Sequence, residues 1–157
     1  MGISSSYKLI KNSIVAFAAK YIPVSEGNAP PPFPPIIGTG FVVHEDGIIA
    51  TNAHVVRAFA NGVFIPPNAP KDEWPVSCML LVLKENGMIE VPLPIIGAFR
   101  IDQFSAGQAY YGPQSGPDLA FVHVKVHGLP AVTLDDGSIL EEGTEVATAG
   151  FRWVPMP

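Results

Sequence analysis

The sequence predicts an all-β protein built as a six-stranded antiparallel barrel. No stretch keeps a helical apolar period for more than about two turns, whereas short runs of apolar and β-branched residues recur between turn residues. Six such runs follow one another, and one long proline-rich segment crosses between the first two. Short antiparallel strands in this number suit a closed barrel, because closure leaves no sheet edge exposed.

The composition indicates a folded protein and excludes some partners. Of the 157 residues, 48% are hydrophobic and 15% are charged, so the chain is too apolar for a disordered segment and long enough for one compact domain. The formal net charge is -5, and the few Lys and Arg residues are scattered. Since nucleic-acid binding needs a clustered basic surface, we expect no nucleic-acid partner.

Cysteine content and hydrophobic length bear on the compartment. Cys78 is the only cysteine, so no internal disulfide can form, which favours a reducing environment. The apolar stretch Ser13–Ala19 is too short to span a bilayer and lacks the cleavage region of a signal peptide. We therefore expect a cytoplasmic protein without a membrane span, and we interpret this stretch as a strand.

The first half of the chain contains the clearest hairpin. A strand at Ile14–Ala19 is followed by the extended, proline-rich crossing Pro23–Pro35. Strands at Ile36–Val43 and Ile48–Asn52 then flank the Asp46-Gly47 turn. Glycine supplies the positive φ that such a tight turn needs, so these two strands are expected to pair.

A short helix and a second hairpin come next. Helical spacing from His54 to Ala60 ends at Asn61-Gly62, which predicts one or two helical turns. Strands at Cys78–Lys84 and Met88–Pro92 flank Glu85-Asn86-Gly87, again a favoured turn sequence. Ile95–Ile101 is expected to continue the second of these strands past a bend at Gly97.

The last predicted barrel strand alternates cleanly. The segment Gln103–Pro117 is rich in Gly, Ser, Gln and Pro and reads as a loop. Leu119–Val126 then places Ala120 and every second residue after it on one apolar face, which predicts a half-buried strand. Beyond it, a further strand is expected at Glu145–Ala149, as the opening of a second unit.

Two stretches resemble the chymotrypsin-like serine proteases, most closely their bacterial HtrA-like and related intracellular branch. The first is Gly38-Thr39-Gly40-Phe41-Val42-Val43 with the later Thr51-Asn52-Ala53-His54-Val55-Val56, and the second is Pro117-Asp118-Leu119-Ala120-Phe121-Val122. The resemblance covers roughly residues 14–151 and is specific through the combination of its blocks. It implies that residues 1–128 form the Greek-key first barrel of a trypsin-like peptidase fold and that residues 129–157 begin an incomplete second barrel.

By this resemblance, His54 is the general base of a catalytic triad and Asp118 is the carboxylate that orients it. The chemistry suits the residue types, because an imidazole exchanges protons near neutral pH and a carboxylate on its other nitrogen fixes the tautomer. Taken alone, His54 reads as a half-buried histidine at a helix start and Asp118 as a turn residue. The barrel has to bring them together across 64 residues of chain.

The sequence offers no convincing nucleophile for this triad. Ser138 is the only serine after Asp118, and its turn lacks the glycine that follows the family's serine. Ser115 lies in Gly112-Pro113-Gln114-Ser115-Gly116, but it shares a loop with Asp118, whereas a triad serine approaches from the other side of the histidine. Cys78 lies in an apolar strand and reads as a buried structural thiol.

The sequence therefore predicts the N-terminal part of a trypsin-like serine endopeptidase, inactive as a separate chain because the serine is missing. Polypeptides are the expected substrate of the complete enzyme, and pairing with a missing second barrel or self-association is expected. The alternative is a non-catalytic, protease-like binding module. We expect no cofactor, and no metal either, because His44, His123 and His127 lack a completing cluster of Cys or carboxylate ligands.

Overall fold

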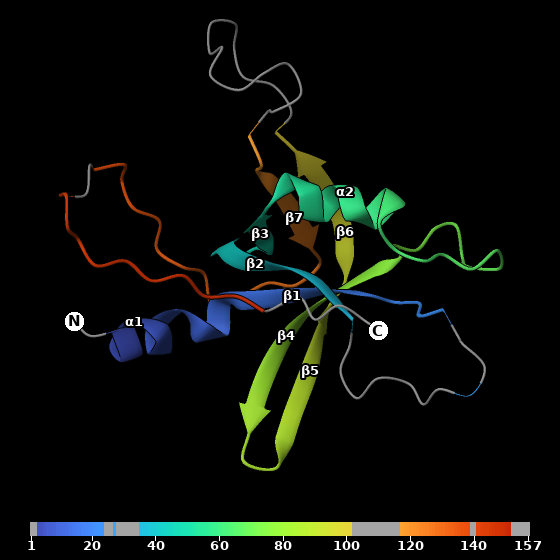
Figure 1. Cartoon of the computed structure of the whole chain (residues 1–157), viewed down its shortest axis with the longest axis horizontal. Helices are drawn as coiled ribbons and strands as arrows, with labels where there is room; N and C mark the ends of the chain where they lie inside the picture. The colour runs from blue at the N-terminus through green and yellow to red at the C-terminus, as the bar shows by residue number, and fades with distance from the viewer. Residues whose placement is uncertain (1–2, 24–26, 28–34, 102–116, 139–140, 152–157) are drawn as a thin grey trace, which may run out of the picture.

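A computed structural model describes residues 3–23, 27, 35–101, 117–138 and 141–151 of the chain. These residues form a curled antiparallel sheet of seven strands with two short α-helices (Figure 1). The elements in chain order are α1 (Ile3–Ile10), a 3-10 turn (Lys11–Ser13), β1 (Ile14–Ala19), β2 (Ile36–His44), β3 (Ile48–Thr51), α2 (Ala53–Asn61), β4 (Val76–Lys84), β5 (Gly87–Leu93), β6 (Ile95–Arg100) and β7 (Ala120–Val124).

The two edge strands of the sheet are consecutive in the sequence. The order is β5-β4-β1-β2-β3-β7-β6, so β5 and β6 are the outermost strands. Only Pro94 separates them in sequence. The sheet therefore curls like a half-barrel, with β5 continuing directly into β6.

All six strands predicted from the sequence are present, and the all-β, antiparallel class is confirmed. The stretch after Pro94, which we expected to continue the preceding strand, is a separate seventh strand because β5 pairs with β4 and β6 pairs with β7. The β6–β7 register shifts between Ile95 and Gly97, close to the position where a bend was predicted. The predicted loop Gln103–Pro117 lies outside the described residues except for Pro117.

The predicted strand at Glu145–Ala149 is wrong. These residues belong to no strand and lie beside α1, with which they line a cavity of about 260 Å³. Their alternating sequence pattern finds no partner strand in the described part of the chain, and a strand needs one to form its ladder. A second barrel is thus not seen among the described residues.

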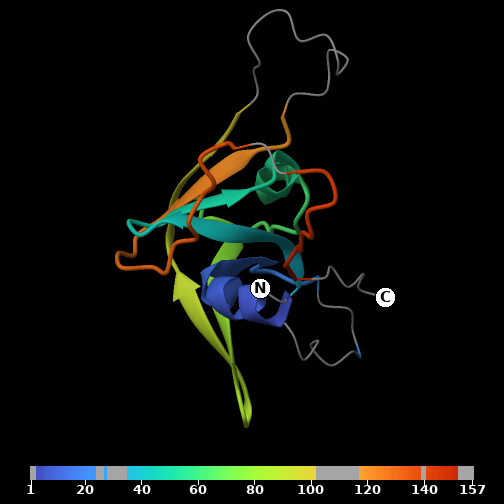
Figure 2. The ribbon, with the colours of Figure 1, turned by 90° about the vertical axis from the view of Figure 1, so that its left-hand side faces the viewer.

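The N-terminal helix α1 was not predicted. Ser4, Ser5 and Ser6 are poor helix formers, so the local sequence gives a weak signal. In Figure 2, α1 (blue) lies below α2 (green), and the β4–β5 hairpin extends further down than α1. No helix among the described residues is long and apolar enough to cross a membrane.

The Asp46-Gly47 turn between β2 and β3 is confirmed. Gly47 has a φ of 90°, and a Cβ atom placed there would lie 2.3 Å from the carbonyl oxygen of Val124. Gly47 also accepts a hydrogen bond from the Val124 N–H through its own carbonyl. Only glycine fits here, because both the backbone angle and the approach of β7 exclude a side chain.

Strand β1 is buried on both faces and is the centre of the core. Val15 and Phe17 point into the main apolar cluster together with residues of β2, β3, α2, β4 and β7. Ala16 and Ala18 face the other way, into a small cluster with Met79 that Phe151 covers. The continuous apolar run of this strand is explained by these two layers, because only a strand covered on both sides lacks polar positions.

Candidate active site

The imidazole of His54 and the carboxylate of Asp118 lie in direct contact. His54 Nδ1 is 2.6 Å from Asp118 Oδ2, and the main-chain N–H of His54 donates to Asp118 Oδ1 over 2.9 Å. Of the sequence-predicted site residues, these are the two that the fold brings together. Their side chains are 62% and 46% exposed, so the pair sits at the surface and is open to solvent.

The pairing of β3 with β7 closes the gap of 64 residues between them. Thr51 at the end of β3 lies opposite Ala120 at the start of β7. Three residues after Thr51, His54 occupies the first turn of α2, and Asp118 precedes Ala120 by two residues. Strand register therefore sets the distance between ring and carboxylate.

Asp118 also caps helix α2. Asn52 occupies the N-cap position, but its side chain makes no capping hydrogen bond to the helix. The free N–H of His54, in the second helical position, is bound instead by the Asp118 carboxylate. A carboxylate at this end of a helix is favourable because the first N–H groups have no partner within the helix and carry partial positive charge.

Asn52 belongs to the site, although no role was predicted for it from the sequence. Its side-chain Nδ2 donates to the main-chain carbonyl of Asp118 over 3.1 Å. The arrangement is reciprocal: Asn52 holds the backbone of Asp118, and Asp118 supplies the helix cap. Asparagine directly before a helix would have suggested a capping hydrogen bond to the helix. In the structure the Asn52 side chain binds the Asp118 carbonyl instead.

Arg57 is the second residue that the sequence analysis missed. Its Nη2 lies 4.0 Å from Asp118 Oδ1. The signal was its spacing, because residues three apart on a helix share a face and Arg57 follows His54 by three.

The charges around Asp118 favour its ionised form. Partial burial acts to raise the pKa of Asp118, but the two hydrogen bonds from His54 and the charges of His54 and Arg57 outweigh it. Together they lower the pKa from its ordinary value of 3.8. Asp118 is thus ionised at neutral pH and can only accept hydrogen bonds, so a neutral ring in this position carries its proton on Nδ1. That tautomer leaves Nε2 with a lone pair.

The other candidate nucleophiles are placed elsewhere or not described. Ser138 lies in an exposed turn, where its Oγ donates to Asp135 over 3.3 Å. Ser115 lies outside the described residues. Cys78 is buried in β4, and this burial raises the pKa of its thiol to about 12, so it is neither accessible nor ionised.

Two of the remaining histidines contact Asp46. His127 Nδ1 lies 3.2 Å from Asp46 Oδ1, and His44 Nδ1 accepts a hydrogen bond from the main-chain N–H of Asp46. Across the described residues, no group of three or more His, Cys, Asp or Glu side chains is arranged to hold a metal ion.

The Gly-Thr-Gly sequence of β2 positions the helix that carries His54. A Cβ on Gly38 would lie 2.5 Å from Val55 Cγ2, and one on Gly40 would lie 2.6 Å from Ile49 Cγ2. Between them, the Thr39 carbonyl accepts a hydrogen bond of 2.8 Å from the Thr51 hydroxyl, just before α2. The glycines thus let α2 and β3 pack directly on the β2 backbone.

Fold and site together define an antiparallel β-protein with a paired histidine and aspartate on the rim of a curled sheet. A family model described as the trypsin-like peptidase domain matches residues 38–156, which include both His54 and Asp118. The chain therefore belongs to the trypsin-like peptidase domain family, and the predicted family is confirmed. The comparison with curated proteins found no match.

Proposed function

We propose that this chain supplies the general base and the orienting carboxylate of a serine endopeptidase, with His54 as the base and Asp118 as the orienter. The observation that carries the proposal is the 2.6 Å contact between His54 Nδ1 and Asp118 Oδ2. It leaves Nε2 free to take a proton from an attacking hydroxyl and to return it to the leaving amine. The substrate class is polypeptide.

We further infer that the seven strands correspond to the six strands of a Greek-key barrel, two of them being parts of one bent strand. In this interpretation β5 and β6 are one bent strand, which pairs with β4 before Pro94 and with β7 after it. Residues 1–128 then form the first barrel, and residues 129–157 lead towards a second one. The second barrel would carry the serine and the oxyanion hole and would pair with the first.

The 157-residue polypeptide alone is proposed to be inactive in peptide hydrolysis. Triad chemistry needs the serine and the N–H donors of the oxyanion hole, and a base without them contributes little.

Cys78, as a single cysteine, also suits a reducing compartment such as the cytoplasm.

The role of the His–Asp pair is tested by the tautomer of His54. Nitrogen-15 NMR of the neutral ring is expected to show the proton on Nδ1 in the wild type. In Asp118→Asn, the amide can present its NH2 to the ring, and the proton is expected to move to Nε2. Asp72→Asn changes an exposed aspartate in the loop before β4 and is the matched control. A wild-type ring protonated on Nε2 would contradict the proposal.

The inactivity of the separate chain is tested with a fluorophosphonate probe, which labels only activated serines. The purified polypeptide is expected to remain unlabelled under conditions in which trypsin is labelled completely. Stoichiometric labelling that disappears in Ser115→Ala or Ser138→Ala would show that the chain carries its own nucleophile.

The alternative function is a protease-like binding module. One observation favours it as an additional role. A groove with basic residues in its lining lies close to the His–Asp pair, and Arg57, which neighbours Asp118, is one of these residues.

A further inference from the structure

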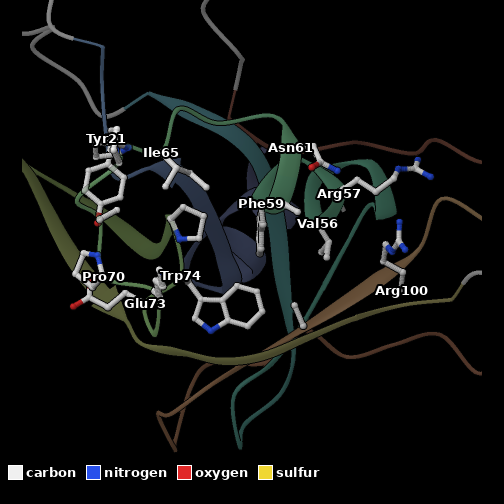
Figure 3. A pocket seen from close by; sticks show the side chains of 17 residues that line it. Tyr21, Val56, Arg57, Phe59, Asn61, Ile65, Pro70, Glu73, Trp74 and Arg100 are labelled. Atoms are coloured by element: carbon white, nitrogen blue, oxygen red, sulfur yellow. The ribbon is translucent and has the colours of Figure 1, made fainter.

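A large open groove runs beneath helix α2 and beside the loop that follows it. Its volume is about 790 Å³, within the range of ligand sites in proteins. Figure 3 shows Arg57 and Arg100 at one end, Tyr21, Pro70 and Glu73 at the other, and Phe59 and Trp74 between them. Residues of α2, of β6 and of the loop before β4 thus line the groove.

The floor of the groove is aromatic and rigid. Trp74 packs edge-on against Phe59, with ring centroids 6.1 Å apart, and Phe59 in turn packs on Phe17 of the core at 5.5 Å. Prolines of the loop, including Pro66 and Pro70, line the wall. Fixed aromatic and proline surfaces favour apolar side chains of a partner, because little conformational entropy is lost on binding.

The charges along the groove are mainly positive although the protein is acidic. Of its described lining residues, three are basic, namely Arg57, Lys71 and Arg100, and Glu73 is the one acidic residue. Glu73 is already paired with Lys20 over 3.3 Å. Three of the chain's 9 Lys and Arg residues thus line the groove, in a chain that has 14 Asp and Glu residues. A positive groove on a negative protein selects anionic partners.

Arg57 can serve the groove without leaving Asp118. Arg57 Nη2 lies 4.0 Å from Asp118 Oδ1, which is beyond hydrogen-bond distance. A guanidinium has five N–H donors, and carboxylates bind them in pairs. The side chain is 54% exposed, so these donors are accessible from solvent.

We propose that this groove binds an extended acidic polypeptide segment in which an aromatic or large aliphatic side chain is flanked by Asp or Glu. The apolar side chain packs on Trp74, and the flanking carboxylates bind Arg57 at one end and Lys71 at the other. The inference goes beyond the proposed function, because it places a binding site outside the His54–Asp118 pair and does not depend on catalysis.

The binding test uses a fluorescein-labelled peptide, Asp-Glu-Phe-Glu-Leu-Asp, and measures anisotropy as the protein is added. Two matched peptides replace every acidic residue, one by Gln and one by Lys. The acidic peptide is expected to bind at least about tenfold more tightly than the Gln peptide, and its affinity is expected to fall as NaCl is raised. Equal affinities for the acidic and Gln peptides would overturn the proposal.

Variants locate the binding on the molecule. Lys71→Glu is expected to weaken the acidic peptide about three- to tenfold, whereas Lys84→Glu, the same charge change at the tip of the β4–β5 hairpin, is expected to change it less than about twofold. Equal losses in both variants would show attraction by net charge alone and would contradict the groove.

Tryptophan emission provides an independent readout. Binding is expected to change the emission of the protein, and this change is expected to disappear in Trp74→Phe, which keeps an aromatic ring in the floor. A change of the same size in Trp74→Phe would place the peptide elsewhere and would overturn the assignment.

Discussion

Asp118 binds His54 at two points, through the ring Nδ1 and through the main-chain N–H. One carboxylate therefore orients the imidazole and fixes the start of the helix that carries it. Since the main-chain bond is made at the first turn of α2, the ring cannot shift along the helix axis without breaking the cap. Ring orientation and helix position are coupled in this site.

Loss of the Asp118 carboxylate is expected to destabilise the fold. Asp118→Ala removes the cap of α2 and its bond to the imidazole, which we expect to lower the free energy of unfolding by about 1–2 kcal/mol. Urea denaturation followed by circular dichroism measures this. Asp72→Ala, at an exposed loop aspartate, serves as the control and is expected to change stability by less than about 0.5 kcal/mol. Similar losses in both variants would contradict the capping role.

The stabilising effect of Asp118 is expected to depend on pH. The pKa of Asp118 is lowered in the folded protein, so its contribution is complete above the ordinary value of 3.8 and is lost as the pH falls through the lower, folded value. The stability difference between wild type and Asp118→Asn should therefore shrink as the pH falls from 5 towards 2. Urea midpoints of both proteins across this range test the sign. A difference that grows between pH 5 and pH 2 would mean that the folded pKa of Asp118 is raised.

A side chain at Gly40 is expected to disturb the packing of β2. In Gly40→Ala the new methyl group would lie 2.6 Å from Ile49 Cγ2 and 2.9 Å from Phe17 Cε2, both in the core. We expect a loss of about 1–3 kcal/mol in the free energy of unfolding. Gly97→Ala is the matched control, because no atom lies within 4 Å of a Cβ placed there. Equal stability of the two variants in thermal unfolding would show that β2 has room to adjust.

Cys78 is expected to report opening of the sheet. Its thiol is buried between β1 and β5, and its pKa of about 12 leaves almost no thiolate at pH 8. Ellman's reagent at pH 8 should therefore react slowly with the native protein and at the rate of a free thiol in 8 M urea. No second cysteine contributes to the signal. Rapid reaction without denaturant would contradict the burial of Cys78.

The contact of Thr39 with Phe151 is expected to hold the segment 141–151 on the sheet. The Phe151 N–H donates to the Thr39 hydroxyl over 2.7 Å. Thr39→Val keeps the shape of the side chain but removes this acceptor, so hydrogen exchange of the Phe151 amide should become faster, about three- to tenfold. Exchange followed by mass spectrometry measures it, with the exposed Thr133→Val as the control. Unchanged exchange in Thr39→Val would show that apolar contacts of Phe151 suffice.

Local patterns predicted most of the fold because its strands are short and end at clear turn residues. The alternation from Ala120 to Val124 and the glycine at position 47 each describe a single element or turn, and both predictions are confirmed. The helix α1 and the segment 145–149 line one cavity although they are far apart in the chain, and no local pattern encodes that arrangement.

The site was predicted only in part, for a similar reason. His54 and Asp118 were found through the resemblance of their surrounding blocks, whereas their contact follows from the β3–β7 register. The roles of Asn52 and Arg57 depend on where Asp118 lies relative to α2, which spacing along the chain does not reveal. The catalytic role of the His–Asp pair stays a prediction. The tautomer experiment tests the ring protonation on which that role depends.

The junction of β5 and β6 has a consequence for the behaviour of the protein at high concentration. Both outermost strands meet at Pro94, and β5 carries a second proline, Pro92, and the charged Glu90. A foreign strand that added to this border would need N–H donors that prolines lack, and it would have to accommodate a buried charge. Pro92 and Glu90 therefore make the β5 edge a less favourable template for the addition of a second strand.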